Sequence, residues 1–268
     1  MKIKLLLISA FLLPTIICCA QSNQPQPALS IANGGKVWAS LYQQRAAEYK
    51  ALCFQAYNMA RWRLDEALKK RKGKKPLAVV TDIDETVLDN TPYDAARAIN
   101  NREFDLKAWK TWTAKGLADT VPGAPSFFKY AAAKGVTVFY ITNRDEDERE
   151  GTTKNLKRYS LPFADAEHII LRTGPSSKED RRKAVLKDYS VVLICGDNLP
   201  DFDAAYDDKP PQPARDTATE KLRSYFGRQY IVIPNPTYGD FENAFFNNQK
   251  MSNAQKDSLI RAVIKLDK

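Results

Sequence analysis

The feature that most constrains the fold is an apolar run that ends abruptly in acidic residues. Residues 78–80 read Ala-Val-Val, and Asp82 and Asp84 follow, two positions apart. A buried strand with acids at its carboxyl end is the usual setting for chemistry in an open α/β sheet. Two carboxylates there can take different protonation states if their surroundings separate their pKa values. Because a solvated turn capped by Asp and Thr gives the same pattern, this segment alone is evenly balanced between a catalytic and a structural role.

Strand and helix patterns alternate along most of the chain. Apolar runs predict strands at residues 77–81, 136–141, 168–171, 191–195 and 230–233. Helical patterns lie near residues 126–134, 146–158, 178–187 and 217–226. Alternating helices and continuous apolar strands indicate a parallel sheet that is covered on both faces. The sequence therefore predicts an α/β fold with helices flanking a parallel sheet.

Three segments depart from this alternation. Apolar residues recur at helical spacing over residues 37–71, which predicts a long N-terminal helix, either single or made of two joined helices. Residues 89–122 contain no clean strand–helix unit, and we expect a small, mainly helical cap over the carboxyl edge of the sheet. Ser252 begins a capping-box sequence, which predicts a final helix through Leu266.

The N-terminus predicts export. Lys2 and Lys4 precede an apolar stretch at residues 5–17, which is shorter than a typical membrane-spanning helix and resembles a signal peptide. Cleavage after Ala20 would release the protein into the periplasm. Lipidation of Cys19 would instead anchor it in the outer membrane, although the residues before Cys19 match a lipidation signal poorly. Both outcomes stay open.

Length and charge set the domain organisation and exclude one class of partner. We expect a signal peptide at 1–20, a flexible tether at 21–35 and one domain at 36–268, with its core starting near residue 76. The net charge of +9 favours anionic substrates weakly. No basic run is interleaved with aromatic residues, which argues against binding of a nucleic acid polymer. The sequence leaves the oligomeric state open, a homodimer included.

The few histidines and cysteines narrow the chemistry further. His168 is the one histidine, so mechanisms that need a histidine pair and zinc sites with several histidines are excluded. Asp and Glu must then carry any hydrolysis, which favours a hard, oxygen-liking cation such as Mg²⁺. We expect His168 at the edge of a strand. Cys53 and Cys195 have the pattern of small core residues, and we expect no disulfide between them.

Polar residues also follow the other predicted strands. Thr142 and Asn143 follow the second strand, Lys178 opens the helix after the third, and Asp197 and Asp201 follow the fourth. A hydroxyl group and free backbone N–H groups at a helix start suit a phosphate oxygen, although a helix cap explains Thr142 equally well. Three acids at one sheet edge would repel each other unless a cation held them. Lys178 and Thr142 could then neutralise and orient a phosphoryl group.

These residues resemble a known family. Segments 79–90 and 196–202 look like the paired signatures of the class C bacterial acid phosphatases, the four-aspartate group of the haloacid dehalogenase (HAD) superfamily that includes the lipoprotein e 5′-nucleotidases. Further segments that resemble this family are 48–52, 55–58, 104–105, Trp109, Trp112, 121–124 and 234–239. The resemblance covers nearly the whole mature chain and implies a HAD-like Rossmannoid sheet with a cap. Phe241 stands where the family pattern has Trp.

The resemblance implies a mechanism. Asp82 would be the nucleophile that forms an aspartyl-phosphate, and Asp84 the general acid and then the base. Mg²⁺ would be held by the Asp82 carboxylate, the Asp84 main-chain carbonyl and Asp197. The phosphate would be held by Thr142, Asn143 and Lys178, with Asp201 positioning Lys178 or a metal-bound water.

The resemblance also bears on the substrate. Trp109 and Tyr238 look like the family's pair of rings that sandwich a nucleobase or a nicotinamide ring. The expected substrates are therefore nucleoside 5′-monophosphates or nicotinamide mononucleotide. Hydrophobic packing between cap and core is the alternative role for both rings. We expect Trp112 to be structural.

The same residues bear on three alternatives to phosphate hydrolysis. A dehalogenase has no use for an acid two residues after the nucleophile, so Asp84 argues against it. A phosphotransferase on the same scaffold stays open, because the sequence does not say whether water or an alcohol accepts the phosphate. A catalytically reduced surface protein that only binds ligands is disfavoured by the complete set Asp82, Asp84, Lys178 and Asp197.

Overall fold

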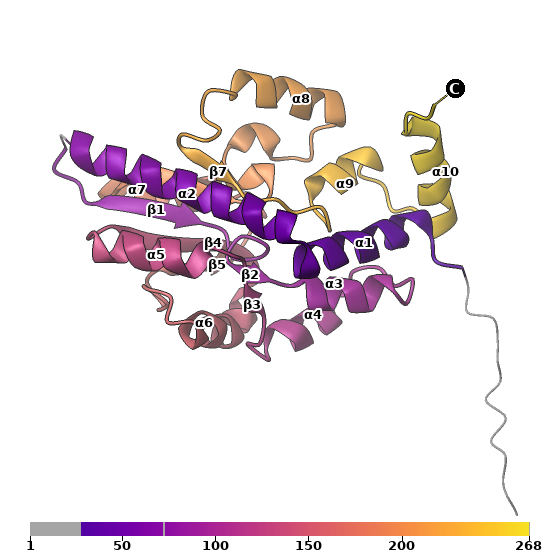
Figure 1. The fold of residues 1–268 in the computed structure, drawn as a ribbon, viewed down its shortest axis with the longest axis horizontal. Coiled ribbons are helices and arrows are strands. Elements are labelled where there is room, and N and C mark those ends of the chain that lie inside the picture. The colour runs from indigo at the N-terminus through magenta and orange to yellow at the C-terminus, as the bar shows by residue number, and fades with distance from the viewer. Residues whose placement is uncertain (1–27, 72, 268) are drawn as a thin grey trace, which may run out of the picture.

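The core of the protein is a parallel sheet of five strands. The computed structural model describes residues 28–71 and 73–267. The predicted signal peptide and Cys19 lie outside the described residues. The strand order is β5-β4-β1-β6-β7, with β1 at the centre (Figure 1). The strands are β1 (Leu77–Thr81), β4 (Thr137–Asp145), β5 (Ile169–Arg172), β6 (Ser190–Gly196) and β7 (Tyr230–Val232). The predicted α/β fold with a parallel sheet is confirmed.

Helices cover both faces of the sheet. On one face, Val79 of β1 packs in a core with Tyr57 of α2 and Phe128 of α5. On the other face, Val80 packs in a core with Val185 of α7. Neighbouring residues of a strand point to opposite faces, and both faces are buried here, which explains the continuous apolar runs. The helices of these layers are α2 (Ala47–Lys70), α5 (Ala124–Ala133), α6 (Arg149–Arg158) and α7 (Glu179–Asp188).

The N-terminal segment is two joined helices and not one. Helix α1 (Ile31–Arg45) is followed by Ala46, whose ψ of 130° is extended, and α2 starts at the next residue. The side chain of Ser30 accepts a hydrogen bond from the first turn of α1 and caps it. The folded domain therefore begins before the predicted boundary at residue 36. Residues 31–35, predicted as part of the tether, are helical.

The predicted cap is an insertion between two short strands. Strands β2 (Leu88–Asp89) and β3 (Asp119–Thr120) pair antiparallel and close its base. Between them lie α3 (Thr91–Ala98) and α4 (Leu106–Thr113). Both helices lie beyond the carboxyl end of β1, on the same side as α1 (Figure 1), and α1 packs against α3. The chain thus brings the N-terminal helix and the cap together over one edge of the sheet.

One helix differs from its prediction at both ends. Helix α8 (Gln212–Lys221) starts and ends about five residues before the predicted range 217–226. Its first turn contains Pro213, where a missing N–H costs nothing because N–H groups of the first turn have no partner inside the helix. The predicted range is wrong because a proline usually suggests the end of regular structure, whereas Pro213 lies at the start of a helix.

The C-terminal part of the chain also lies at this edge of the sheet. Helix α9 (Asp240–Phe245) follows the last strand, and α10 (Asn253–Val263) packs against α1. The capping box of Ser252 and Gln255 is confirmed, while α10 ends three residues before Leu266. The short 3₁₀ helices are η1 (Glu146–Glu148), η2 (Leu199–Asp201) and η3 (Ala204–Tyr206).

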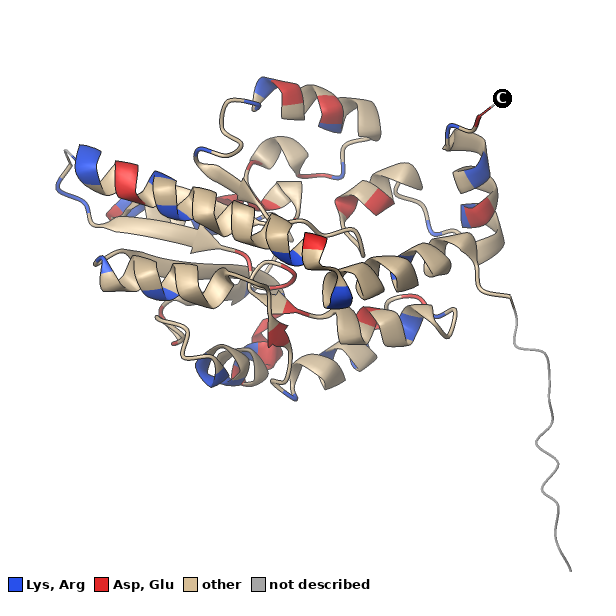
Figure 2. Cartoon of the chain, viewed as in Figure 1, with Lys and Arg blue, Asp and Glu red and all other residues tan. Residues whose placement is uncertain are grey.

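Surface charge and hydropathy add two observations. Lys and Arg alternate with Asp and Glu on helices such as α8 and α10, and acidic residues stand where β1 ends (Figure 2). Within residues 28–71 and 73–267, no helix combines the length and apolarity that crossing a membrane requires.

Candidate active site

The carboxyl ends of β1 and β6 bring the predicted acids together. The backbone N–H of Asp82 donates to the carbonyl of Cys195 at 2.9 Å, which continues the pairing of the two strands to their last residues. Asp197 therefore follows β6 beside Asp82. Carboxylate oxygens of Asp82, Asp197 and Asp201 all lie within 4.8 Å of one another. Asp82, which is more than 100 positions from the other two acids in the sequence, thus converges with them as predicted.

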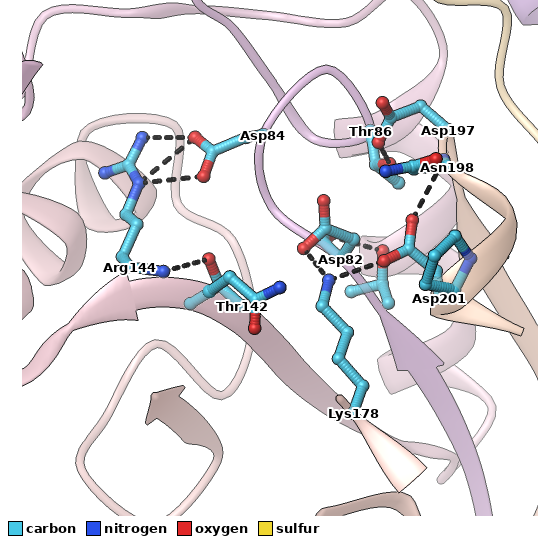
Figure 3. Close-up of polar contacts among 12 residues, drawn as sticks. Asp82, Asp84, Thr86, Thr142, Arg144, Lys178, Asp197, Asn198 and Asp201 are labelled. Carbon is cyan, nitrogen blue, oxygen red and sulfur yellow. Dashed lines mark hydrogen bonds and ion pairs between the residues drawn. The ribbon is translucent and has the colours of Figure 1, made fainter. Parts of the chain in front are cut away.

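Lys178 lies between two of the three acids. Its Nζ is 2.6 Å from Asp201 Oδ1 and pairs with Asp82 Oδ1 as well (Figure 3). The side chain of Lys178 is only 5% exposed, so the ammonium is held inside the protein by these two carboxylates. The expected contact between Asp201 and Lys178 is present in the structure.

Glycine at position 196 makes the approach of Asp201 possible. A Cβ atom there would lie 2.5 Å from the Cβ of Asp201, closer than real Cβ contacts. The backbone of Asp201 is further tied to Asn198, because each accepts a hydrogen bond from the other's backbone N–H in a capping box. The sequence Gly-Asp-Asn-Leu-Pro-Asp thus folds its second acid back onto the end of β6.

Burial raises the pKa values of two of the carboxyl groups, those of Asp82 and Asp197. The pKa of Asp82 is raised to about 7, chiefly by burial; the Lys178 ammonium opposes the rise, and Asp201 and Asp84 add to it. The pKa of Asp197 is raised well above its usual range by burial, and then by repulsion from Asp201 and Asp82. The ammonium of Lys178 does not balance three acids, of which Asp82 and Asp201 are buried and Asp197 is half-buried. The group is therefore suited to a further cation.

The donor set fits a divalent metal. Asp197 accepts a hydrogen bond from Thr86 Oγ1 at 3.0 Å through Oδ1 and from Asn235 Nδ2 at 2.8 Å through Oδ2. Such outer contacts fix the orientation of ligating carboxylates in metal sites. Buried oxygen ligands without histidine or thiolate favour a hard cation of the Mg²⁺ type. The structure thus offers the carboxylates that the sequence predicted for this role.

Asp84 faces a different partner. Its carboxylate points away from Asp82 and toward Arg144 (Figure 3). Arg144 Nη2 is 2.7 Å from Asp84 Oδ1, and Arg144 Nε is 3.2 Å from Oδ2. Asn90 Nδ2 donates to Oδ1 at 2.8 Å. The two predicted catalytic carboxylates therefore have separate environments, one beside a lysine and one beside an arginine.

Thr142 and Asn143 lie inside β4 and do not follow it, because the strand continues to Asp145, four residues beyond its predicted end. Asp145, and not Thr142, forms the capping box of the following helical turn. The Thr142 hydroxyl is buried and accepts a hydrogen bond from the backbone N–H of Arg144 at 3.2 Å. Arg181 donates to the Thr142 carbonyl and to Asn143 Oδ1, both at 2.6 Å.

A cavity of about 890 Å³ opens beside these residues. Asp82, Asp84, Lys178, Trp109 and Tyr238 all line it, so the site and the two predicted stacking rings share one space. Its outer wall is formed by α1, α3, α9 and the segment before α10.

The two rings are fixed by their own contacts. Trp109 packs edge-on against Tyr93, with ring centroids 5.2 Å apart, and lies 5.7 Å from the guanidinium carbon of Arg144. The hydroxyl of Tyr238 donates to Glu85 Oε2. Trp112 packs against the core and donates a hydrogen bond to Asn90 at 2.8 Å, which agrees with the structural role expected for it.

Several residues of the site carry no sequence signal of their own. Arg144 lies in the segment Thr-Asn-Arg, where nothing distinguishes it from a surface arginine. Glu85 is fully buried with a φ of +54°, and its Oε1 accepts from the Asn90 backbone N–H at 2.7 Å. Asn235 joins the site from beyond β7.

The predicted edge residue His168 lies outside the site, beside Asp165 at 2.7 Å, and Cys53 and Cys195 are buried and free.

Comparison with known proteins gives a consistent result. A family model described as HAD superfamily, subfamily IIIB (Acid phosphatase) matches residues 30–241. The chain is 28% identical over 131 residues to "Acid phosphatase 1" of Solanum lycopersicum, a match that covers 46% of this chain and 51% of that protein. It is 25% identical over 215 residues to the "Class B acid phosphatase" of Rahnella sp. (strain Y9602), covering 76% of this chain and 84% of that protein. The chain thus spans only about half the length of the first of these relatives.

A solved structure covers more of the chain. The class C acid phosphatase from Bacillus anthracis superposes with a TM-score of 0.83 and 37% sequence identity, over 88% of this chain and 99% of that one. The same enzyme, solved with tungstate bound, gives the same TM-score and identity over 89% of this chain and 99% of that one.

Proposed function

The chain belongs to the acid phosphatases of HAD subfamily IIIB, which indicates a phosphomonoester hydrolase, and from this premise we propose that it is an exported, Mg²⁺-dependent phosphatase of nucleoside 5′-monophosphates or nicotinamide mononucleotide. The observation that carries the proposal is the convergence of Asp82, Asp197 and Asp201 around Lys178 at the mouth of one cavity. Trp109 and Tyr238, which lie far apart in the sequence, line this cavity as well.

In the proposed reaction, Asp82 attacks the phosphorus atom and the bond to the leaving oxygen breaks. Asp84 gives its proton to that oxygen, so the leaving group departs as an alcohol. Water then attacks the aspartyl-phosphate, with Asp84 taking a proton from it, and phosphate is released. The two carboxylates have separate surroundings, Asp82 beside Lys178 and Asp84 beside Arg144, so each can take a different role.

Other residues of the chain position these two. Lys178, paired with Asp82 and Asp201, carries the positive charge nearest the attacking oxygen and would also attract phosphate oxygens. Thr142 and Asn143 at the end of β4 are proposed to complete the phosphate site. Mg²⁺, held by Asp82, Asp197 and the main-chain carbonyl of Asp84, would reduce repulsion between the carboxylate and the phosphate.

Trp109 and Tyr238 are proposed to hold a planar ring of the leaving group. Both rings line the cavity that contains Asp82 and Asp84. Stacking on a flat ring contributes about 1–3 kcal/mol per base and is tolerant of which base is bound. The site would therefore accept several nucleotides.

Export is proposed from the sequence alone, on the basic start and the apolar stretch at residues 5–17. Mass spectrometry of the protein purified from a bacterial cell envelope would distinguish cleavage after Ala20 from a lipid on Cys19.

The test of the catalytic proposal is a panel of phosphomonoesters. The purified protein would be assayed with 4-nitrophenyl phosphate, glycerol phosphate, nicotinamide mononucleotide and nucleoside 5′-monophosphates, with Mg²⁺ and with chelator. We expect Mg²⁺-dependent release of phosphate and a higher kcat/KM for the nucleotides. Activity that persists in chelator, or a preference for glycerol phosphate, would contradict the proposal. Added nucleoside acceptor would reveal phosphotransfer by the appearance of a new phosphorylated product.

A further inference from the structure

One carboxyl group in the wall of the cavity has an oxygen that no hydrogen bond accounts for. Asp94, on α3, lines the cavity, and its Oδ2 is buried without a hydrogen-bond partner among the described residues. Most buried polar atoms in proteins are paired, so each exception needs an explanation. A buried acceptor that is left unpaired destabilises the folded protein.

The surroundings of Asp94 do not neutralise it. The basic residue whose charge acts most strongly on Asp94 is Lys36 of α1, and Lys36 forms its ion pair with Glu242 of α9, at 3.0 Å. Burial raises the pKa of Asp94 to about 7; Lys36 opposes the rise, and Asp89, Asp84 and Glu242 add to it. Three elements that are distant in sequence thus place a poorly compensated carboxyl group in the cavity.

The position of Asp94 relates it to the leaving group. The preceding residue, Tyr93, packs against Trp109, and Trp109 lines the same cavity. The charge of Asp94 also helps to raise the pKa of Glu85, after burial, and the Glu85 carboxyl group accepts the hydrogen bond from the hydroxyl of Tyr238, the second ring. A ligand whose phosphate lies at Asp82 and whose ring lies between Trp109 and Tyr238 would therefore bring its sugar and ring edge near Asp94.

We propose that Asp94 is a specificity-determining residue that accepts a hydrogen bond from a donor group, a sugar hydroxyl or a ring N–H, on the nucleoside part of the substrate. The inference rests on the proposed function and extends it from stacking to polar recognition. Acidic residues commonly bind ribose hydroxyls in nucleotide sites. A site that hydrogen-bonds a substrate group rejects analogues that lack the group, because its own polar atom is then left unpaired.

The test compares analogues that lack one donor each. Wild type, Asp94→Asn and Asp94→Ala would be assayed with adenosine 5′-monophosphate, its 2′-deoxy and 2′,3′-dideoxy forms, and purine riboside 5′-monophosphate, which lacks the amino group. Asp240→Asn is the matched control. It removes the same charge from the same cavity, but Asp240 Oδ1 already accepts a hydrogen bond from Asn243, at 3.2 Å.

We expect wild type to favour the full nucleotide over at least one analogue by about tenfold in kcat/KM, because an analogue without the donor leaves the acceptor oxygen of Asp94 unpaired. In Asp94→Ala this ratio falls to within about twofold of one, and in Asp240→Asn it is retained. Loss of discrimination against the deoxy forms assigns the donor to the sugar, and loss against the amine-free analogue assigns it to the ring. Asp94→Asn, which keeps an acceptor oxygen and the side-chain shape, should lie between wild type and Asp94→Ala.

Two results would overturn the inference. If nucleotides are hydrolysed but the ratios are the same in wild type and both Asp94 variants, Asp94 has no role in specificity and the proposed function stands. If wild type hydrolyses 4-nitrophenyl phosphate but no nucleotide, the nucleotide substrate and the role of Asp94 both fail.

Discussion

Arg144 and Asp84 form a bidentate ion pair at the carboxyl edge of the sheet. Arg144 Nη2 lies 2.7 Å from Asp84 Oδ1, and the arginine side chain is only 1% exposed. A planar guanidinium fixes a carboxylate in direction as well as in place. Arg144 Nη1 is itself held by Thr152 Oγ1 at 3.1 Å, so Asp84 is oriented from the inside of the protein.

The first prediction concerns the leaving group. Asp84→Asn should lower kcat for adenosine 5′-monophosphate by about 10²-fold or more, because a poor leaving group needs a proton as it departs. The loss should be much smaller with 4-nitrophenyl phosphate, whose leaving group departs without one. Arg144→Lys should lower both rates by less than Asp84→Asn does, and again more for adenosine 5′-monophosphate than for 4-nitrophenyl phosphate. The reason is that the positive charge beside Asp84 stays, while the orientation of the carboxylate is lost. Equal losses on the two substrates would rule out a proton-donor role for Asp84.

The second prediction concerns metal binding. Thr86→Val removes the hydrogen bond to Asp197 Oδ1 without removing a ligand, and should weaken Mg²⁺ binding about tenfold, in the range seen for outer contacts of metal sites. Asp197→Asn should weaken it more. Isothermal titration calorimetry with Mg²⁺ alone would measure both, with no substrate present. Wild-type affinity in Asp197→Asn would remove this residue from the metal site.

The third prediction concerns stacking. Trp109→Ala should raise KM for nucleoside 5′-monophosphates by about tenfold, in accordance with about 1–3 kcal/mol per stacked base, and should affect 4-nitrophenyl phosphate far less. Trp62→Ala is the control, because Trp62 of α2 is 54% exposed and does not line the cavity. If Trp109→Ala changes both substrates equally, the ring serves packing between cap and core.

The fourth prediction concerns pH and stability. The raised pKa of Asp94, about 7 in the folded protein against 3.8, means that the folded protein holds this proton more tightly than the unfolded chain. Asp94 therefore lowers stability progressively as the pH rises from about 4 to 7. The charged groups that act on it are Lys36, Asp84, Asp89 and Glu242.

Asp94→Asn removes this effect. Its free energy of unfolding should match wild type near pH 4 and exceed it above pH 7. The upper bound is about 4 kcal/mol, at about 1.4 kcal/mol per pKa unit, and partial exposure of Asp94 will reduce it. Urea denaturation across this pH range provides the measurement. A variant less stable than wild type above pH 7 would show that Asp94 stabilises the fold.

The sheet was predictable because both of its faces are buried. Each strand is a continuous apolar run, and each run is followed by the polar residues that mark its carboxyl end, as with Asp82 and Asp197. Parallel pairing then brings those ends together whatever lies between them in the sequence. The local sequence therefore predicts most of the acidic residues that meet at the carboxyl edge of the sheet.

The remainder depends on contacts that no local pattern encodes. The partner of Asp84 is an arginine 60 residues away, and its identity follows from the path of β4 beyond Thr142. The environment of Asp94 combines α1, α3 and α9, whose relative positions come from tertiary packing. The break at Ala46 and the early start of α8 depend on a single backbone angle and on one proline, which helical periodicity does not detect.

The most direct test of the central claim is the turnover of Asp82→Asn with adenosine 5′-monophosphate and Mg²⁺. We expect the variant to fold, to bind Mg²⁺ through its remaining ligands and to release no phosphate above background, because an amide does not attack phosphorus as a carboxylate does. A folded Asp82→Asn variant that keeps appreciable phosphatase activity would contradict the assignment of Asp82 as the nucleophile.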